Sequence, residues 1–390
     1  MNRRGVAVLG STGSIGRTTL EVIDAFPDRF RVVALTAHRS ADALIAQVVR
    51  FQPELAVLVD GELAGLPRST ETRVASGWDS VLEAASHPDV DIVVNALVGA
   101  AGLEPSLAAL GAGKRLALAN KESLVVGGPL IMRALGEGGG ELIPVDSEHS
   151  AVFQCLEGSD RASVRRIVLT ASGGPFRERD PLELAGVTPE EALRHPTWNM
   201  GAKITVDSAT LVNKALEIIE AHHLFGLPYD QVAVVIHPQS IVHSLVEFQD
   251  GSALAQLGYP TMAVPVLYAL NYPERLPFET PRLDLAEIGA LTFEPVPPER
   301  FPAFELGREA ALRGGTAPAV FNAAGEEAVA AFLAERIAFT EIPDVIREAL
   351  AGHVVEDVTR LEIVKKADAW ARQAARASAD ALAKRTQRLV

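Results

Sequence analysis

Residues 6–16 read VAVLGSTGSIG, and this stretch decides the fold class. The apolar run Val6–Leu9 predicts a buried strand, and a helix-like segment, Arg17–Phe26, follows the glycines. Glycine lets the backbone turn sharply, and the start of a helix presents free amides to an anion such as pyrophosphate. The spacing is G-x-x-G-x-x-G rather than G-x-G-x-x-G. On spacing alone, a glycine turn without a nucleotide is therefore an equally good interpretation.

The alternation of apolar strands with amphipathic segments continues to about residue 145. Unbroken apolar strands alternating with helices indicate a parallel sheet covered on both faces. The predicted strands are Val6–Leu9, Val32–Thr36, Leu55–Val59, Ile92–Ala96, Leu116–Leu118 and Leu142–Val145. We therefore predict an α/β protein that begins with a Rossmann-like, doubly wound parallel sheet.

The pattern changes beyond residue 150 and again near residue 273. The central stretch predicts a helix over Ser208–His223 and an α+β domain whose last two strands pair antiparallel. Its predicted strands are Val164–Leu169, Val232–His237, His243–Phe248 and Ala253–Leu257. Seven prolines between residues 273 and 302 predict an extended connector, because proline fixes φ and removes a donor. Helical spacing then predicts a C-terminal bundle, with helices over Ala317–Glu335, Ile342–Ala351 and Thr359–Arg388.

Composition excludes several classes of protein. The 390 residues carry a formal net charge of −14, which argues against a sequence-independent grip on nucleic acid. The single cysteine, Cys155, excludes an intramolecular disulfide and a Cys-based zinc cluster. The longest charge-free stretch, 251–273, is interrupted by prolines and is expected to be a buried strand and turn rather than a membrane span. No leader segment is apparent, so a cytoplasmic protein is expected.

The residues after the second predicted strand bear on cofactor choice. An acid at this position commonly binds the ribose hydroxyls of NAD, but this chain has His38, Arg39 and Ser40. A guanidinium and a hydroxyl suit a 2′-phosphate, which favours NADP(H). The competing interpretation for Arg39 is a solvated residue at the start of a helix.

An acidic pair follows the strand predicted at Leu142–Val145. Asp146 and Glu148 stand two residues apart, so both carboxylates can face one side of an extended chain and share a cation. Open α/β sheets bind ligands at the carboxyl ends of their strands. The competing interpretation is an N-cap, with Asp146 or Ser147 capping a helix and Glu148 in its first turn. On this pair alone, the N-cap is the stronger interpretation.

A second polar group lies in the helix predicted at Ser208–His223, with Asp207 or Ser208 as its cap. Asn213 and Lys214 precede Glu217 by four and three residues, so the three share one helix face. A Lys–Glu surface ion pair would explain that spacing equally well. Taken with Asp146 and Glu148, however, Glu217 completes a hard oxygen donor set suited to Mg²⁺ or Mn²⁺.

Two polar loops add further candidates. Residues 195–201, HPTWNMG, include one of three tryptophans, Trp198, which is either a core anchor or the cover of a lid that excludes water. The glycine turn at 171–175 can offer Ser172 to an anion, and its competing interpretation is a plain turn.

Seven motifs along the chain together resemble the 1-deoxy-D-xylulose 5-phosphate reductoisomerase family, and the resemblance covers essentially the whole sequence. In order they are GSTGSIG at 10–16, NALVGAAG at 95–102, LANKES at 118–123, PVDSEH at 144–149, ASGGPF at 171–176, HPTWNMGAKITVDSATLVNKALE at 195–217 and HPQSIVHS at 237–244. The family implies NADPH- and Mg²⁺- or Mn²⁺-dependent conversion of 1-deoxy-D-xylulose 5-phosphate, a small phosphorylated sugar, to 2-C-methyl-D-erythritol 4-phosphate. It also implies a homodimer formed through the central domain, with no nucleic-acid or membrane partner.

The resemblance also implies a role for each matching residue. The metal ligands would be Asp146, Glu148 and Glu217, and these acids together with Lys121 would be the catalytic residues. The substrate would contact Lys121, Ser147, Glu148, Ser172, His195, Trp198, Ser208, Asn213, Lys214 and Glu217. The cofactor would contact Thr12, Gly13, Ser14, Ile15, His38, Arg39, Ser40, Asn120, Glu122 and Gly201. His38 and Ser40 depart from the Gly and Asn that the family commonly has there.

The resemblance implies four segments: an NADPH-binding domain at 1–148, a catalytic and dimerisation domain at 149–272, the connector at 273–302 and a helical domain at 303–390. Two other functions fit parts of the sequence. An NADP-dependent oxidoreductase of the homoserine or aspartate-semialdehyde dehydrogenase type explains the first 145 residues but needs no three-acid metal site. A nucleotide-sensing or scaffold protein would keep the fold without turnover, but it would not need all three acids.

Overall fold

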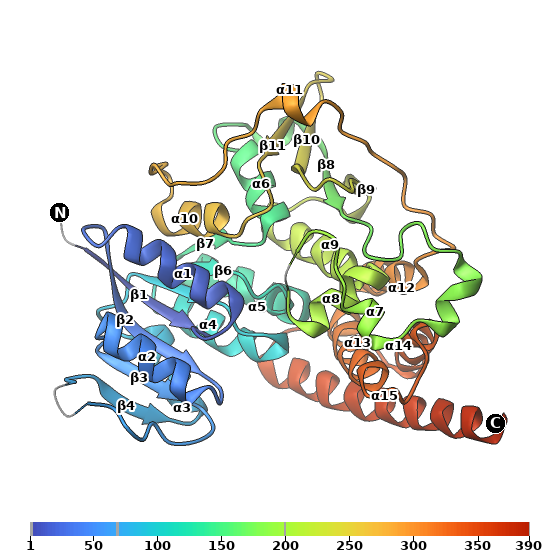
Figure 1. The fold of residues 1–390 in the computed structure, drawn as a ribbon, viewed down its shortest axis with the longest axis horizontal. Helices are drawn as coiled ribbons and strands as arrows, with labels where there is room; N and C mark the ends of the chain where they lie inside the picture. The colour runs from blue at the N-terminus through green and yellow to red at the C-terminus, as the bar shows by residue number, and fades with distance from the viewer. Residues whose placement is uncertain (1–2, 68–69, 199, 390) are drawn as a thin grey trace. The chain divides into compact units, whose positions relative to one another are not determined.

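The computed structural model describes residues 3–67, 70–198 and 200–389. The chain divides into two compact units. Their helices and strands are labelled in Figure 1. Unit 1 comprises residues 1–123, 131–150 and 261–280, and unit 2 comprises residues 124–130, 151–260 and 281–390. The four predicted segments remain a prediction.

Unit 1 is built on a parallel sheet of seven strands in the order β4-β3-β2-β1-β5-β6-β7. The strands are β1 (Arg4–Leu9), β2 (Phe30–Ala37), β3 (Leu55–Leu58), β4 (Arg73–Ser76), β5 (Ile92–Asn95), β6 (Arg115–Leu118) and β7 (Glu141–Pro144). β1, β2, β3 and β5 are almost wholly buried, as expected for strands covered on both faces. The predicted α/β class and doubly wound sheet are confirmed.

Most helices of unit 1 contact strands of this sheet. The helices of unit 1 are α1 (Ser14–Ala25), α2 (Ala41–Phe51), α3 (Trp78–Ser86), α4 (Leu103–Gly111), the second half of α5 (Glu122–Gly138), the start of α6 (Ser147–Cys155) and α10 (Ala263–Asn271). α1 packs against α10, and α3 packs against α4. The strand order reverses between β1 and β5, so the loop after β1 lies where open sheets bind ligands.

Two expectations in this unit were wrong. The edge strand β4 was not predicted, because its residues, Arg73–Ser76, are largely exposed and show no apolar run. The end of the charge-free stretch was expected to be strand and turn, but Ala263–Asn271 forms the helix α10. Helix packing against α1, which periodicity in a short apolar run does not reveal, decides this conformation.

Unit 2 contains a four-stranded mixed sheet in the order β11-β10-β8-β9. Its strands are β8 (Val164–Ala171), β9 (Val232–Ile236), β10 (Val242–Phe248) and β11 (Ala253–Leu257). β10 pairs antiparallel with both β8 and β11, as predicted for the last two strands, whereas β8 and β9 are parallel.

The helix predicted at Ser208–His223 is two helices, α8 (Ala202–Thr210) and α9 (Val212–Phe225). Leu211, at φ 56°, separates them in the left-handed region, which a leucine adopts only when surrounding contacts impose it. Asp207 and Ser208 therefore lie inside α8 and do not cap the second helix.

The last part of unit 2 is helical, as predicted. α12 (Pro302–Arg313), α13 (Ala317–Leu333), α14 (Ile342–Gly352) and α15 (Leu361–Leu389) pack together, and α12 also packs on α9. Unit 2 also contains two short helices, α7 (Pro189–Ala192) and α11 (Leu285–Ile288). α11 lies within the predicted extended connector.

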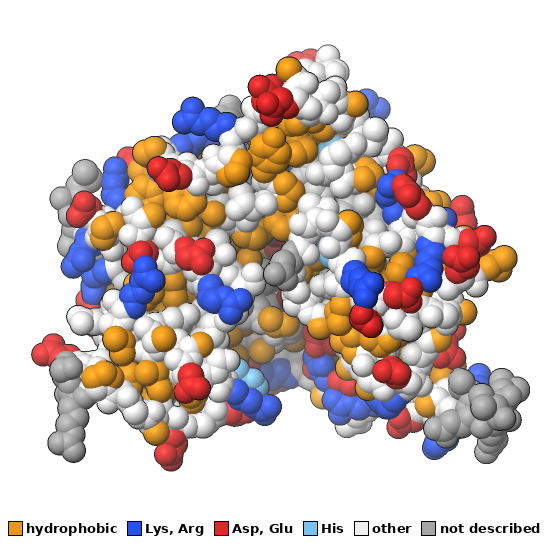
Figure 2. All heavy atoms as spheres, viewed as in Figure 1, with side chains coloured by type: hydrophobic (Ala, Val, Ile, Leu, Met, Phe, Trp, Pro, Cys, Tyr) orange, Lys and Arg blue, Asp and Glu red, His pale blue; other side chains and the backbone are white. Residues whose placement is uncertain are grey.

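The surface drawn in Figure 2 carries acidic and basic side chains interspersed, rather than gathered by sign. The net negative charge is thus not concentrated on this face. None of the helices in the described ranges is both long enough and apolar enough to cross a membrane.

Candidate active site

The glycine turn follows β1 and leads into α1. Gly10 has φ 78°, and a Cβ there would lie 2.7 Å from the Ala96 carbonyl oxygen. A Cβ on Gly16 would lie 2.3 Å from the Gly10 carbonyl oxygen. Packing therefore requires both of these glycines. Gly13 instead is exposed and stands at the N-cap of α1 without a side chain, so the first turn of the helix is open to an anion.

Three predicted cofactor residues follow β2, and all three are exposed. The Nε and Nη2 atoms of Arg39 lie 3.2 and 3.1 Å from Asp60 Oδ2, and His38 Nε2 lies 3.1 Å from the same oxygen. Ser40 is the N-cap residue of α2. His38 and Arg39 thus point at one anion, as they would at a 2′-phosphate. Sequence reasoning missed Asp60, although its place just after the third strand was a signal.

Asn120 and Glu122 are buried in unit 1. Asn120 Nδ2 donates to the carbonyl oxygens of Leu97 (2.9 Å) and Gly99 (3.0 Å), and to Glu122 Oε2 (2.9 Å). Asn120 Oδ1 accepts from the Ser123 N–H at 3.0 Å. The Asn120 side chain therefore ties the NALVGAAG loop to the start of α5. Its predicted contact with the cofactor remains a prediction.

The predicted acidic pair stands at the carboxyl end of β7. Lys121 Nζ donates to Asp146 Oδ2 at 3.0 Å, and both side chains are about nine-tenths buried. Asp146 Oδ1 accepts from the backbone N–H of Glu148 (3.0 Å) and of His149 (3.3 Å), as an N-cap does. Ser147 Oγ donates to Glu148 Oε2 at 2.9 Å. Asp146 is thus the N-cap of α6, as the second interpretation predicts, and the sharing of a cation by Asp146 and Glu148 remains a prediction.

His195 is the centre of a cluster in unit 2. Its Nδ1 accepts from the backbone N–H of Thr197 (3.1 Å) and of Trp198 (2.9 Å). Because a backbone N–H only donates, Nδ1 carries no proton, and the ring is neutral with its hydrogen on Nε2. Burial also lowers the pKa of His195, which favours the same neutral ring.

The other nitrogen of the His195 ring faces two serines. Nε2 lies 3.1 Å from Ser172 Oγ and 3.1 Å from Ser208 Oγ. Ser172 Oγ also accepts from the Gly174 N–H at 3.2 Å. The single Nε2 hydrogen is shared between the two serine oxygens, so each serine keeps its own hydroxyl hydrogen to donate to an anion. Three segments between residues 172 and 208 thereby bring two hydroxyl donors together at the His195 ring.

The loop that carries His195 leads into α8. Trp198 is half-buried, and Gly201 is the exposed N-cap of α8. Asn199, within the predicted lid, lies outside the described residues. The roles of Trp198 as a cover and of Gly201 in cofactor binding remain predictions.

Asn213, Lys214 and Glu217 share one face of α9, as predicted. Asn213 Nδ2 donates to Glu217 Oε1 at 2.5 Å, and Lys214 Nζ pairs with Glu217 Oε2. The side chains of Lys214 and Glu217 are almost completely buried, which is unusual for a surface ion pair. The surface-pair interpretation is therefore wrong for these two residues.

The acids of the predicted metal site belong to different parts of the fold. Asp146 and Glu148 are in unit 1, and Glu217 is in unit 2. Within its own unit, each carboxylate is held in place by hydrogen bonds from neighbouring side chains or backbone. Their joint binding of one metal ion remains a prediction.

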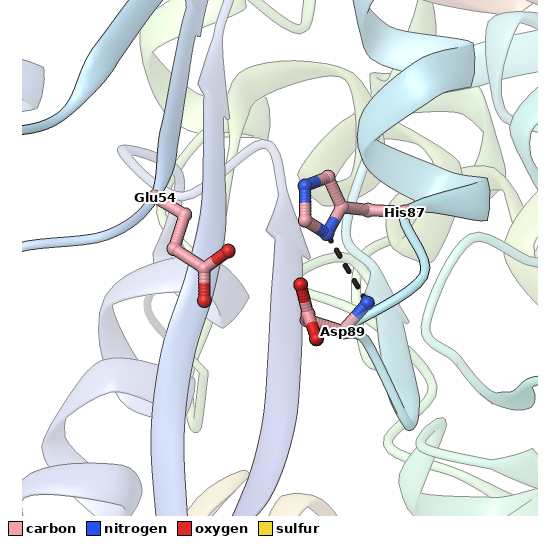
Figure 3. Close-up of side chains that lie close together, drawn as sticks. All are labelled: Glu54, His87 and Asp89. Atoms are coloured by element: carbon pink, nitrogen blue, oxygen red, sulfur yellow. Dashed lines mark hydrogen bonds between the residues drawn. The ribbon is translucent and has the colours of Figure 1, made fainter.

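A second group with metal-binding side chains is Glu54, His87 and Asp89 (Figure 3). These residues precede β3 and β5, at the edge of the sheet opposite the glycine turn. Arg31 already pairs with Glu54, and its Nη2 lies 3.5 Å from the Asp89 carbonyl oxygen. The Arg31 guanidinium already neutralises the Glu54 carboxylate, and both acids are exposed. We therefore do not assign a metal site to these three residues.

Comparison with known proteins adds independent evidence. Three family models match the chain. The model for 1-deoxy-D-xylulose 5-phosphate reductoisomerase matches residues 6–128, and the model for the C-terminal domain of 1-deoxy-D-xylulose 5-phosphate reductoisomerase matches residues 142–225. A third model, described as the DXP reductoisomerase C-terminal domain, matches residues 257–374. The enzyme of that name from Symbiobacterium thermophilum is 52% identical over 382 residues, which cover 96% of this chain and 98% of that protein. The chain belongs to the 1-deoxy-D-xylulose 5-phosphate reductoisomerase family.

Other relatives agree along the whole length. The reductoisomerase from Thermomicrobium roseum is 54% identical, over 96% of this chain and 97% of that protein. The solved structure of the Zymomonas mobilis reductoisomerase in complex with NADPH has a TM-score of 0.92 and is 44% identical in sequence. The match covers 98% of this chain and 100% of that chain. A reductoisomerase solved with NADPH, fosmidomycin and magnesium has a TM-score of 0.91 and is 41% identical in sequence. That match covers 96% of this chain and 98% of the other.

Membership of the reductoisomerase family confirms the resemblance drawn from the seven motifs. It decides against the homoserine or aspartate-semialdehyde dehydrogenase alternative, because the match extends through both units. It also makes the chain an NADP-dependent oxidoreductase rather than a scaffold protein.

Proposed function

We propose that this chain converts 1-deoxy-D-xylulose 5-phosphate and NADPH into 2-C-methyl-D-erythritol 4-phosphate, in non-mevalonate isoprenoid biosynthesis. The reaction rearranges the carbon skeleton and reduces the resulting aldehyde. The observation that carries the proposal in the chain itself is the convergence of Ser172 and Ser208 on His195 Nε2, at 3.1 Å each. Such a cluster of neutral donors suits a phosphate group.

The substrate phosphate would be held by residues of unit 2. Ser172 and Ser208 contribute hydroxyl donors that the His195 ring holds in position, and Asn213 and Lys214 contribute an amide and an ammonium group. Because the phosphate is remote from the bonds that change, its binding energy is available to order the loop that carries Trp198 and to exclude water.

The donor set fits a divalent metal ion. Asp146, Glu148 and Glu217 offer hard carboxylate oxygens, which suit Mg²⁺ or Mn²⁺. Lysine ammonium groups contact two of these acids, Lys121 on Asp146 and Lys214 on Glu217, so positive charge is already favoured there. When bound, such an ion supplies Lewis-acid polarisation of the ketone oxygen. We propose that the three acids are its ligands.

Unit 1 would hold the cofactor. The open first turn of α1, with Thr12, Gly13, Ser14 and Ile15, faces the pyrophosphate, while Arg39, His38 and Ser40 face the 2′-phosphate. Asn120 and Glu122 hold the loop after β5 in place through the Asn120 side chain, and they are proposed cofactor contacts of the same unit. Gly201, in unit 2, is the remaining proposed contact. NADPH supplies the hydride.

We also propose a homodimer in the cytoplasm. β11 is an edge strand of the second sheet, and its apolar side chain Leu254 is 50% exposed. Exposed apolar edge strands readily pair with another chain, so this edge is our candidate for the dimer contact. Light scattering of the wild-type chain and of Leu254→Lys tests it, since the variant is expected to shift toward monomer.

The decisive experiment measures NADPH absorbance with the purified chain. Oxidation is expected only with 1-deoxy-D-xylulose 5-phosphate present. It should stop on exhaustive chelation and return when Mg²⁺ or Mn²⁺ is added. A hydroxamate-bearing phosphonate should inhibit competitively. Full activity after chelation, or no turnover with this substrate, would contradict the proposed function.

A further inference from the structure

The proline-rich segment before α12 is hydrogen-bonded to the second sheet rather than free of it. The backbone N–H and carbonyl of Ile236 exchange 2.9 Å hydrogen bonds with those of Glu294. His237 Nδ1 lies 2.8 Å from the Thr292 carbonyl oxygen, and its ring stacks on Phe293. Residues 292–294 therefore extend the sheet at the end of β9. We call residues 292–300 the brace.

Arg300, at the end of the brace, reaches the loop that carries Ser172. Its Nη1 donates to the carbonyl oxygens of Phe176, at 3.1 Å, and of Arg177. The side chain is half-buried. A guanidinium presents several N–H groups in a rigid fork, so one side chain can hold two successive carbonyl groups in one orientation.

The loop returns the contact. Arg177 Nη1 donates to Glu294 Oε1 at 2.6 Å. A Cβ on Gly173 would lie 2.8 Å from Cδ of Arg177, so this side chain runs directly beneath the glycine turn. Charge-assisted hydrogen bonds thus join the brace and the loop in both directions. Arg300 of the brace donates to the loop, and Arg177 of the loop donates to the brace.

The backbone of this loop determines where Ser172 Oγ lies. Gly173 and Gly174 have φ of 83° and 70°, a conformation that needs glycine. A Cβ on Gly174 would lie 2.7 Å from the Ser208 carbonyl oxygen, so the loop rests on the backbone of α8. A shift of the carbonyl groups that follow would therefore move Ser172 relative to Ser208 and His195. Binding sites tolerate about 0.5 Å of such movement.

We propose that Arg300 is a positioning residue for the substrate phosphate, acting through the backbone of residues 173–177. This role of Arg300 rests on the proposed function, because it assumes that Ser172 and Ser208 bind the substrate phosphate. Arg300 itself is assigned no contact with substrate. Its loss should weaken substrate binding and leave the chemistry and the cofactor site in unit 1 largely unchanged.

The test compares steady-state kinetics of the full chain with Arg300→Met and Arg300→Lys. Methionine removes every donor but keeps most of the aliphatic length, whereas lysine keeps the charge and one donor group. We expect Arg300→Met to raise KM for 1-deoxy-D-xylulose 5-phosphate about tenfold, with kcat within about threefold and KM for NADPH unchanged. Arg300→Lys should recover part of the loss.

Arg308→Met is the matched control. Arg308 lies on α12, is exposed and pairs only weakly with Glu305, at 3.4 Å. Its KM values should equal those of the wild-type chain. Thermal unfolding of all variants separates a local shift of the loop from global loss of structure.

An unchanged KM for the sugar phosphate in Arg300→Met, with only a lower Tm, would overturn the proposal. If Arg300→Met does not fold, Glu294→Gln weakens the reciprocal pair and must raise the same KM; an unchanged value there would also overturn the proposal. Absence of turnover in the wild-type chain, by contrast, contradicts the proposed function itself, so the two failures are distinguishable.

Discussion

At the scale of single residues, the site depends on side chains whose hydrogen-bonding roles are determined by their neighbours. His195 is the clearest case. Two backbone N–H groups occupy its Nδ1, so the ring can act only as a donor through Nε2. Protonation of Nδ1 would break the turn between His195 and Trp198. His195 therefore suits binding of an anion better than proton transfer.

Glu217→Gln should abolish turnover while leaving the fold intact. A neutral amide cannot replace a metal-binding carboxylate, and it leaves the buried Lys214 ammonium without its charge partner. Even loss of an outer-shell residue costs about 10–100-fold, so we expect activity in the NADPH assay to fall at least about 100-fold. Circular dichroism should remain that of the wild-type chain.

Glu348→Gln is the matched control for that substitution, because Glu348 is exposed on α14. It should retain wild-type turnover. Near wild-type activity in Glu217→Gln would remove Glu217 from the proposed site.

Arg39→Ala should weaken the binding of NADPH much more than the binding of NADH. Charge-assisted hydrogen bonds contribute about 1.5–3 kcal/mol, so KM for NADPH should rise about 10–100-fold. KM for NADH should change by less than about threefold, since NADH has no 2′-phosphate for the guanidinium to bind. Steady-state kinetics with each cofactor at saturating sugar phosphate measure both values. Equal losses for the two cofactors would mean that Arg39 does not read the 2′-phosphate.

At the scale of elements, helix α5 changes direction and partner along its length. Gly127 has φ −135° and ψ 24°, outside the helical range, and residues 124–130 belong to unit 2. The next residue, Gly128, packs against α9, where a Cβ would lie 2.2 Å from the His223 ring. The sequence GGP at 127–129 thus permits a kink and a close helix contact.

Gly128→Ala should therefore destabilise the chain, although alanine favours helix by about 1 kcal/mol over glycine. Overpacking of this kind costs about 1–3 kcal/mol, and the half-buried His223 ring lies directly where the added methyl group would go. Chemical denaturation measures the free energy of unfolding.

His223→Ala in the same chain provides the control, since it removes the ring that the new methyl group meets. The double variant should be less destabilised than the sum of the two single variants. Strict additivity would show that the contact between α5 and α9 is not the cause.

At the scale of the whole molecule, stability should depend on pH through His223. Burial, with a smaller contribution from His222, lowers the pKa of His223 from 6.5 to about 4. Above pH 6.5, the ring is neutral in both folded and unfolded chains and has no effect. As the pH falls from 6.5 to 4, only the unfolded chain binds the proton, so folding stability is lost, by about 3 kcal/mol in total.

Acidic residues also titrate in this range, so the comparison is with His223→Gln, which cannot bind the proton. Between pH 7 and pH 4.5, the wild-type chain should lose about 2 kcal/mol more than the variant, by denaturant unfolding at each pH. Parallel curves for the two chains would contradict the assigned protonation.

Local sequence determined the class of fold, and it supplied the candidate residues of the proposed site. Unbroken apolar runs such as Ile92–Asn95 have to be buried on both faces, and the spacing of glycines from Gly10 to Gly16 permits one kind of turn. These patterns extend over a few residues, so they can be recognised without the rest of the chain. The same holds for Asn213, Lys214 and Glu217, which one helix places on one face.

Only the tertiary structure decided the features that depend on contacts between distant residues. The break between α8 and α9 at Leu211, the helix α10, the pairing of Asp60 with Arg39 and the contact of Arg300 with the Ser172 loop are of this kind. Their residues have no distinctive local pattern, because their conformations follow from packing and hydrogen bonds to segments up to 124 positions away. The sequence therefore determined which groups the reaction has available. The tertiary structure determined which side chains hold those groups in position.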